Sequence, residues 1–194
     1  MPDNPPRKVA VLVGSLRREA YSRKLAKALI EVAPPPLVAS IVEIGALPLY
    51  NQDLEGDGTP MPWREFRDRI RRCDGVLFVT PEYNRSVPAA LKNAIDVGSR
   101  PYGKSAWSGK PCAVVSASPG AIGGFGANHH LRQCLVFLDM PVLQQPEMYV
   151  GGVDKLVESG GKVTSDKTRE FFTGFLSKFA AWVERNAAPR SEKP

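Results

Sequence analysis

The sequence predicts an α/β fold in which five parallel strands form a doubly wound sheet, with helices on both of its faces. The order of the segments along the chain leads to this expectation. Short apolar runs alternate with segments of helical periodicity from one end of the chain to the other. Parallel strands joined by crossover helices form such sheets, and most of their residues are buried on both faces. We expect the strand order 2-1-3-4-5, which places the third strand in the middle of the sheet.

The strands are predicted from apolar runs that lack the alternation of a half-buried strand. The clearest runs are Val-Ala-Val-Leu-Val at 9–13 and Gly-Val-Leu-Phe-Val-Thr at 75–80. The five predicted strands cover 8–13, 37–44, 75–80, 111–116 and a short stretch near Val142.

The helices are predicted from apolar residues that recur at intervals of three and four. In the first helix, Tyr21, Leu25 and Leu29 fall on one face, and the prolines at 34–36 end the helix. Ser86 is the expected N-cap of the third helix. The predicted helices cover 21–32, 62–72, 86–97, a segment around 131–138 and the stretch 172–183.

Length and composition predict one domain over 1–194, with loose tails at about 1–6 and 188–194 where proline and charge are frequent. The net charge is +6, but the basic residues of 64–72 alternate with acids, which is typical of a solvated helix face rather than a nucleic-acid surface. No apolar run approaches the roughly 20 residues of a membrane helix, and the first residues lack the apolar core of a signal peptide. We expect a cytoplasmic protein that binds neither nucleic acid nor membrane.

The cysteines and histidines do not predict a metal site. Cys73, Cys112 and Cys134 are odd in number and widely spaced, which argues against a disulfide framework or a zinc site and favours a reducing compartment. Cys112 and Cys134 lie in apolar stretches, so we expect these two to be buried free thiols. His129 and His130 are adjacent, so on a helix their side chains point in different directions. We expect surface or interface histidines.

The first of three informative loops, 14–22, joins the first strand to the first helix. A helix N-terminus suits a phosphate, Ser15 and Ser22 add hydroxyl donors, and Arg17 adds a forked charge. The loop has neither the Gly-x-x-x-x-Gly-Lys pattern of an ATP site nor the Gly-x-Gly-x-x-Gly pattern of a dinucleotide site. It predicts a compact monophosphate site, and a plain turn capped by serine is the alternative.

Two further loops follow the third and fourth strands. Pro81 stiffens the backbone, Tyr83 offers a ring and a hydroxyl, and Asn84 offers a donor and an acceptor. Together they suit a flat ring such as isoalloxazine, although Tyr83 could instead be a core aromatic and Asn84 a turn residue. Glu82 is interpreted as structural or backbone-binding, because hydride transfer to a flavin needs no acid or base. The glycines of 116–124 let a backbone approach a flat ligand closely, or else form a mobile loop.

Several motifs in the same order along the chain carry a resemblance. They are Gly-Ser-Leu-Arg at 14–17 with Ser22, Pro-Leu-Tyr-Asn at 48–51, Pro-Glu-Tyr-Asn at 81–84, Ser-Val-Pro at 86–88, Leu-Lys-Asn-Ala-Ile-Asp at 91–96, and Gly-Gly at 123–124 followed by Leu-Arg-Gln at 131–133. From about 9 to 152 the chain resembles the NADPH-dependent FMN reductase family, and in particular its flavodoxin-like quinone and chromate reductases.

The resemblance implies a flavodoxin-like fold, FMN as cofactor and NADPH (or NADH) as hydride donor. A small acceptor then takes the electrons: a quinone, an azo or nitro compound, a metal oxyanion or free flavin. The resemblance also implies a homodimer or homotetramer, and no catalytic side chain, because the chemistry takes place on the flavin. The implied FMN-binding residues are Gly14, Ser15, Leu16, Arg17, Tyr21 and Ser22 at the phosphate and ribityl chain, Pro81, Glu82, Tyr83 and Asn84 at the ring, and Ser116 and Ala117 at its far edge.

Two alternatives remain open at this point. A flavodoxin-type electron carrier would dock on protein partners without turnover of its own, but such carriers are generally acidic and this chain is basic. A regulatory domain could keep the fold without the flavin, because fold does not fix function.

Overall fold

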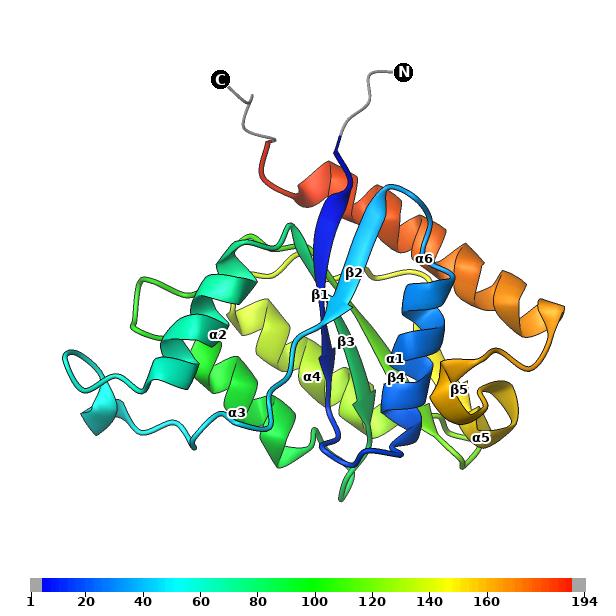
Figure 1. Ribbon diagram of the computed structural model, residues 1–194, viewed down its shortest axis with the longest axis horizontal. Helices are drawn as coiled ribbons and strands as arrows, with labels where there is room; N and C mark the ends of the chain where they lie inside the picture. The colour runs from blue at the N-terminus through cyan, green and yellow to red at the C-terminus, as the bar shows by residue number, and fades with distance from the viewer. Residues whose placement is uncertain (1–4, 190–194) are drawn as a thin grey trace.

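The computed structural model describes residues 5–189, and its strands form one parallel sheet in the order β2-β1-β3-β4-β5. The strands are β1 (Arg7–Val13), β2 (Leu37–Ile41), β3 (Gly75–Pro81), β4 (Cys112–Ser118) and β5 (Met148–Gly151). Figure 1 shows the strands running side by side with helices on both faces of the sheet. The predicted fold class and strand order are confirmed.

The helices connect the strands and form two layers. They are α1 (Tyr21–Glu31), α2 (Met61–Arg71), α3 (Ala89–Gly98), α4 (Phe125–Phe137), α5 (Val153–Leu156) and α6 (Asp166–Asn186), with short 3₁₀ turns η1 (Gln52–Leu54) and η2 (Ser159–Gly161). One cluster of buried side chains unites the sheet with α1, α5 and α6, and a second unites it with α2, α3 and α4. Among the described residues, no helix is both long enough and apolar enough to cross a membrane.

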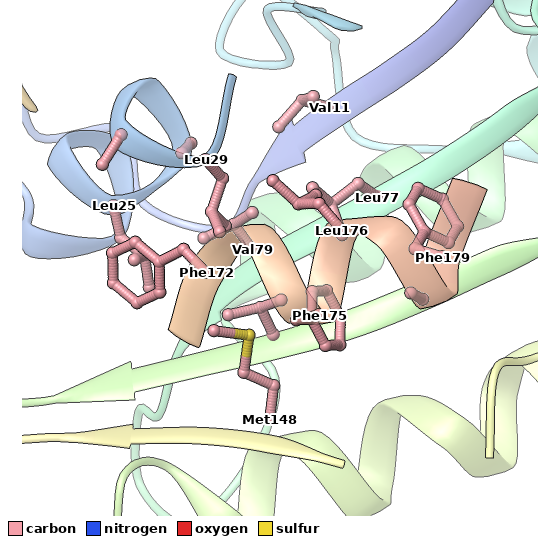
Figure 2. Packing of buried hydrophobic residues seen from close by; sticks show 14 of the residues in the cluster. Val11, Leu25, Leu29, Leu77, Val79, Met148, Phe172, Phe175, Leu176 and Phe179 are labelled. Carbon is pink, nitrogen blue, oxygen red and sulfur yellow. The ribbon is translucent and has the colours of Figure 1, made fainter. Parts of the chain in front are cut away.

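Helical periodicity explains how α6 covers the sheet. Phe172, Phe175, Leu176 and Phe179 recur at intervals of three and four, so they lie on one face of the helix. Figure 2 shows this face against side chains of β1, β3 and β5 and against α1. Both Phe172 and Phe179 are fully buried, and burial of such a side chain stabilises the fold by about 1.5–3 kcal/mol.

Three predicted elements differ from the structure in their position or bounds. The helix expected from Ser86 begins at Ala89, because Ser86 belongs to a tight turn in which Tyr83 and Ser86 exchange both backbone hydrogen bonds. The last strand lies at Met148–Gly151, whereas Val142 makes only an isolated bridge with Cys112. In addition, β2 ends at Ile41 rather than at 44.

The two ends of the described chain lie at the amino edge of the sheet, opposite the edge where the three informative loops meet (Figure 1). The predicted tails fall in part outside the described residues. Of the described part, the backbone oxygen of Ala188 accepts a hydrogen bond from Arg7 Nη1 at 3.1 Å. The chain therefore remains attached to the sheet as far as this residue.

Candidate functional site

The three loops come together because β1, β3 and β4 are neighbours in the sheet. Gly14 N donates to Val79 O at 2.9 Å, so the first loop leaves β1 directly against β3. A Cβ atom at position 14 would lie 2.8 Å from Thr80 Oγ1 and 3.0 Å from the Pro81 ring. Only glycine permits this close approach of the first two loops.

The N-terminus of α1 lacks the groups that usually complete a helix end. Its N-cap is Ala20, which provides no capping side chain. The Ser22 side chain in the first turn is 1% exposed, and its Oγ has no hydrogen-bond partner within residues 5–189. A buried hydroxyl without a partner costs about 1–3 kcal/mol. A phosphate at the positive end of the helix dipole would satisfy both the hydroxyl and the free N–H groups. The geometry therefore fits the FMN phosphate.

Arg17 and Tyr21 stand beside this helix end. The Arg17 side chain is exposed and makes no ion pair within the described part of the chain. Ser15 Oγ accepts a hydrogen bond from Arg17 N at 3.3 Å, which turns the loop. Tyr21 is 38% exposed, and Lys24 Nζ lies 5.7 Å from its ring centroid. An uncommitted guanidinium at a helix N-terminus is suited to bind an anion.

The second loop is a two-residue hairpin rather than the start of a helix. Asn84 and Arg85 have φ values of 49° and 61°, as the hairpin turns that match strand twist require. The left-handed conformation is tolerated by asparagine and costs about 1–2 kcal/mol for arginine. The turn holds Tyr83 71% exposed. Tyr83 is therefore not a core aromatic, and Asn84 is indeed a turn residue.

Glu82 ties the hairpin to α4. Its Oε2 accepts a hydrogen bond from Ala127 N at 3.1 Å, in the first turn of that helix, where a negative charge is favoured by the helix dipole. Its Oε1 accepts one from Arg85 Nη1 at 3.2 Å. The carboxylate is thus bound to backbone and to arginine, in agreement with the structural interpretation of Glu82.

The third loop begins later than predicted, because Ser116 and Ala117 still belong to β4 and their side chains point to opposite faces of the sheet. Ser116 Oγ is buried and accepts a hydrogen bond from Asn128 Nδ2 at 3.2 Å, while Ala117 is packed in the core on the α6 side. Both residues can therefore offer a ligand only their backbone. Gly123 has a φ of +63°, and a Cβ there would lie 2.7 Å from the carbonyl carbon of Tyr149.

Asn128 is a residue of the site's framework that the sequence did not reveal. It is fully buried in α4. Besides Ser116, it donates to Met148 O at 3.4 Å and accepts from Arg132 Nε at 2.9 Å. These bonds hold the end of β4 against α4 and β5. No local pattern marks such a residue, since its partners in β4 and β5, Ser116 and Met148, lie 12 and 20 residues away in the chain.

The histidines are exposed, as predicted. His129 Nε2 lies 2.9 Å from the hydroxyl of Tyr149, and His130 Nδ1 lies 2.7 Å from Ser86 Oγ. Burial, followed by a hydrogen bond with Glu147, raises the pKa of Tyr149 to about 12. The described residues contain no group of metal-ligating side chains.

All three cysteines are free. Cys112 is fully buried, and this burial raises the pKa of its thiol. Cys73 and Cys134 are only partly buried, so the expectation of a buried thiol is wrong for Cys134.

Comparison with known proteins agrees with this geometry. The family model for NADPH-dependent FMN reductases matches residues 7–155. The chain belongs to this family. A quinone reductase of Pseudomonas putida is 67% identical over 180 residues, which cover 93% of this chain and 96% of the relative. A 2-hydroxy-1,4-benzoquinone reductase of a Burkholderia species is 47% identical over 176 residues, which cover 91% of this chain and 96% of the relative.

A solved structure supports the same assignment. A flavoenzyme NAD(P)H:acceptor oxidoreductase of Paracoccus denitrificans superposes with a TM-score of 0.88 at 41% identity, over 94% of this chain and all of that chain. This FMN reductase family member is thus an FMN-dependent oxidoreductase that uses NAD(P)H, as predicted, rather than the electron carrier considered as an alternative.

Proposed function

We propose that this enzyme reduces quinones, and that residues of the three loops hold the FMN. The observation that carries the cofactor site is the buried, unpartnered Ser22 hydroxyl at the uncapped N-terminus of α1. When bound, FMN would accept hydride from NADPH or NADH and pass two electrons to the quinone. The acceptor class follows from the P. putida and Burkholderia relatives.

Each loop has a distinct part in this proposal. Ser22, Ser15 and Arg17 bind the phosphate, because they supply hydroxyl donors and an uncommitted positive charge beside free N–H groups. Tyr83 and Asn84 line the ring from the hairpin. Further proposed contacts come from Gly14, Leu16, Tyr21, Pro81 and Glu82, and from the backbone of Ser116 and Ala117.

The rim around the loops favours a flat, largely apolar acceptor. Tyr83 is 71% exposed, Leu49 77% and Leu16 54%. All three follow the carboxyl ends of β1, β2 or β3, where ligands of doubly wound sheets bind. Apolar walls with a few polar groups are typical of small-molecule sites. A quinone ring suits this rim better than a hydrated metal oxyanion.

The test is an anaerobic titration of the enzyme with NADPH, after which a quinone is added. Purified enzyme loaded with FMN should lose its flavin absorbance when NADPH is added, and regain it when 1,4-benzoquinone is added. An azo dye, a nitroaromatic and chromate serve as competing acceptors at equal concentration. The proposal is refuted if the reduced flavin is reoxidised more slowly by the quinone than by one of these.

We also propose that the enzyme is a homodimer or homotetramer. Val136 and Phe137 on α4 are 72% and 84% exposed, and Phe125 on the same helix is 48% exposed. A helix with apolar residues on its outer as well as its inner side is typically covered on both. Light scattering at micromolar concentration should find a dimer or tetramer, and an active monomer would refute this.

We further propose a cytoplasmic location. The three free cysteines are compatible with a reducing compartment, and NADPH is the donor of the family. Cell fractionation should recover the enzyme with cytoplasmic markers, whereas recovery with periplasmic or membrane markers would refute the location.

A further inference from the structure

One buried side chain, that of Asn93 in α3, binds the backbone of the segment 47–50. Asn93 of α3 is 9% exposed. Its Nδ2 donates to Leu47 O at 3.2 Å and to Pro48 O at 3.1 Å, and its Oδ1 accepts from Tyr50 N at 2.8 Å. An asparagine can make at most four hydrogen bonds. Here three of them go to the backbone of the four residues 47–50.

A second side chain binds the same segment from α2. Trp63 Nε1 donates to Pro48 O at 3.0 Å, and the ring centroids of Trp63 and Tyr50 lie 5.3 Å apart. Loops with so little secondary structure are usually mobile. The segment 47–50, in contrast, is attached to two helices by four side-chain hydrogen bonds.

What this attachment holds in place is an exposed leucine. Leu49 lies between the two anchored residues Pro48 and Tyr50 and is 77% exposed. Leu49 does not belong to either core cluster, whereas Leu47 and Tyr50 pack against one of them. Fixing a backbone position costs about 1–2 kcal/mol per residue. Rigid presentation of an apolar side chain to solvent is typical of a binding contact.

The position of the segment connects it to the cofactor site. It follows the carboxyl end of β2, beside β1. Just before it, a Cβ atom at Gly45 would lie 3.3 Å from Leu16 Cδ2, so the two loops are in contact. On the other side it is bound to α3, the helix that follows the Tyr83 hairpin. The segment therefore lies at the β2 side of the proposed FMN site.

We propose that Leu49 forms the β2-side wall of the acceptor site, and that Asn93 is a positioning residue that fixes this wall. The inference rests on the proposed reduction of quinones, and it adds the residues that select the acceptor. A flat apolar quinone gains contact area from a fixed leucine, whereas a small, highly charged acceptor such as ferricyanide gains none. Leu49 and Asn93 should consequently influence the KM for quinones and not the reduction of FMN by NADPH.

The experiment compares three variants with equal FMN content: Leu49→Ala, Asn93→Ala and the control Leu54→Ala. Leu54 is 39% exposed in the neighbouring turn η1 and lies outside the anchored segment. For Leu49→Ala and Asn93→Ala, we expect the KM for 1,4-benzoquinone to rise about tenfold. This is the decrease in affinity expected when one well-packed apolar contact is lost. Their kcat, their rates with ferricyanide and their flavin reduction by NADPH should stay within about twofold of wild type. Leu54→Ala should match wild type throughout.

The outcomes separate the wall from the proposed function. An unchanged quinone KM in Leu49→Ala overturns the inference even if Asn93→Ala fails to fold, because Leu49 is exposed and its truncation leaves the core intact. An unchanged KM in Asn93→Ala, with only a lower melting temperature, shows that Asn93 is merely structural and overturns its positioning role. A wild-type enzyme that is reduced by NADPH but does not turn over quinone refutes the proposed function itself, and the inference with it.

Discussion

The amino and carboxyl ends of the parallel strands, which we call the two edges of the sheet, differ in how completely their buried polar groups are hydrogen-bonded. At the amino edge, the buried guanidinium of Arg7 makes four hydrogen bonds. It donates to both carboxylate oxygens of Glu184, to Asp74 and to Ala188 O, at 3.0–3.2 Å. At the carboxyl edge, Ser22 Oγ is equally buried and has no partner within the described residues. Buried polar groups are nearly always hydrogen-bonded in folded proteins. We propose that the FMN phosphate provides the partner that Ser22 lacks in the protein itself.

A groove at the amino edge provides a second comparison between the two edges. A groove of about 550 Å³ lies at the amino edge and is lined by β1, β2 and α2, including Lys8, Asp68, Arg69 and Arg72. Its charges are of both signs, and no unpartnered buried atom has been found in its walls among the described residues. Volume alone therefore does not identify the functional edge. The proposed FMN site rests instead on the unpaired hydroxyl of Ser22.

The largest expected effect is on stability, at the amino edge. Arg7→Ala should lower the free energy of unfolding by about 3 kcal/mol, at the low end for removal of one partner of a buried pair, since Glu184 is half exposed. The Kd for FMN should not change. Urea denaturation and FMN titration measure the two quantities. A weaker FMN affinity in this variant would contradict the account, in which the amino edge contributes to stability and only the carboxyl edge binds FMN.

The next effect is on cofactor binding, at the carboxyl edge. Arg17→Ala should weaken FMN binding by about 2 kcal/mol, or roughly thirtyfold in Kd, because it removes a hydrogen bond to a charged group. The stability of the apoprotein should not change, because the Arg17 side chain is exposed. Dialysis followed by absorbance measurement provides the simplest check. Full retention of FMN by the variant would show that Arg17 does not bind the phosphate.

The smallest effect concerns a cation at the same edge that already has a partner. Arg23 donates to both oxygens of Glu43 at 2.8 and 2.6 Å, and these hydrogen bonds lower the pKa of Glu43. The folded-state pKa therefore lies below the unfolded value, so the pair stabilises the fold above about pH 4.3 and this contribution is lost as the pH falls through the lowered pKa.

Glu43→Gln should accordingly reduce the free energy of unfolding by only about 0.5 kcal/mol at pH 7, because the Glu43 side chain is 66% exposed and screened by solvent. The difference from wild type should vanish in acid, and FMN affinity should be unaffected. Denaturation at several pH values tests the trend. A difference that grows as the pH falls would contradict it.

The sheet was predictable because its signals are local. The apolar runs of β1, β3 and β4 and the spacing of Phe172, Phe175 and Phe179 each lie within a single element. β5 was not predicted at its true position, because it is a short edge strand in which Met148 and Val150 are buried and Tyr149 is not. That alternation carries less signal than the apolar residues around Val142.

The candidate site could be predicted only in part. Gly14, Ser22 and the Tyr83 loop follow strand ends, and the rule that ligands bind there locates them. The hairpin at Asn84 lacks the usual Asn-Gly pair, so Ser86 resembled a helix cap. Asn93 and Asn128 act on backbone segments that only the folded chain brings to them. These contacts depend on the tertiary structure, so no spacing of residues in the sequence predicts them.

The most direct test of the contrast between the edges is Ser22→Ala, with apoprotein stability and FMN affinity measured on the same preparation. Removal of an unpaired buried hydroxyl should leave the apoprotein as stable as wild type or more stable by about 1 kcal/mol, while the Kd for FMN rises about tenfold. A less stable apoprotein with unchanged FMN affinity would contradict the account, because it would mean that Ser22 serves the fold and not the phosphate.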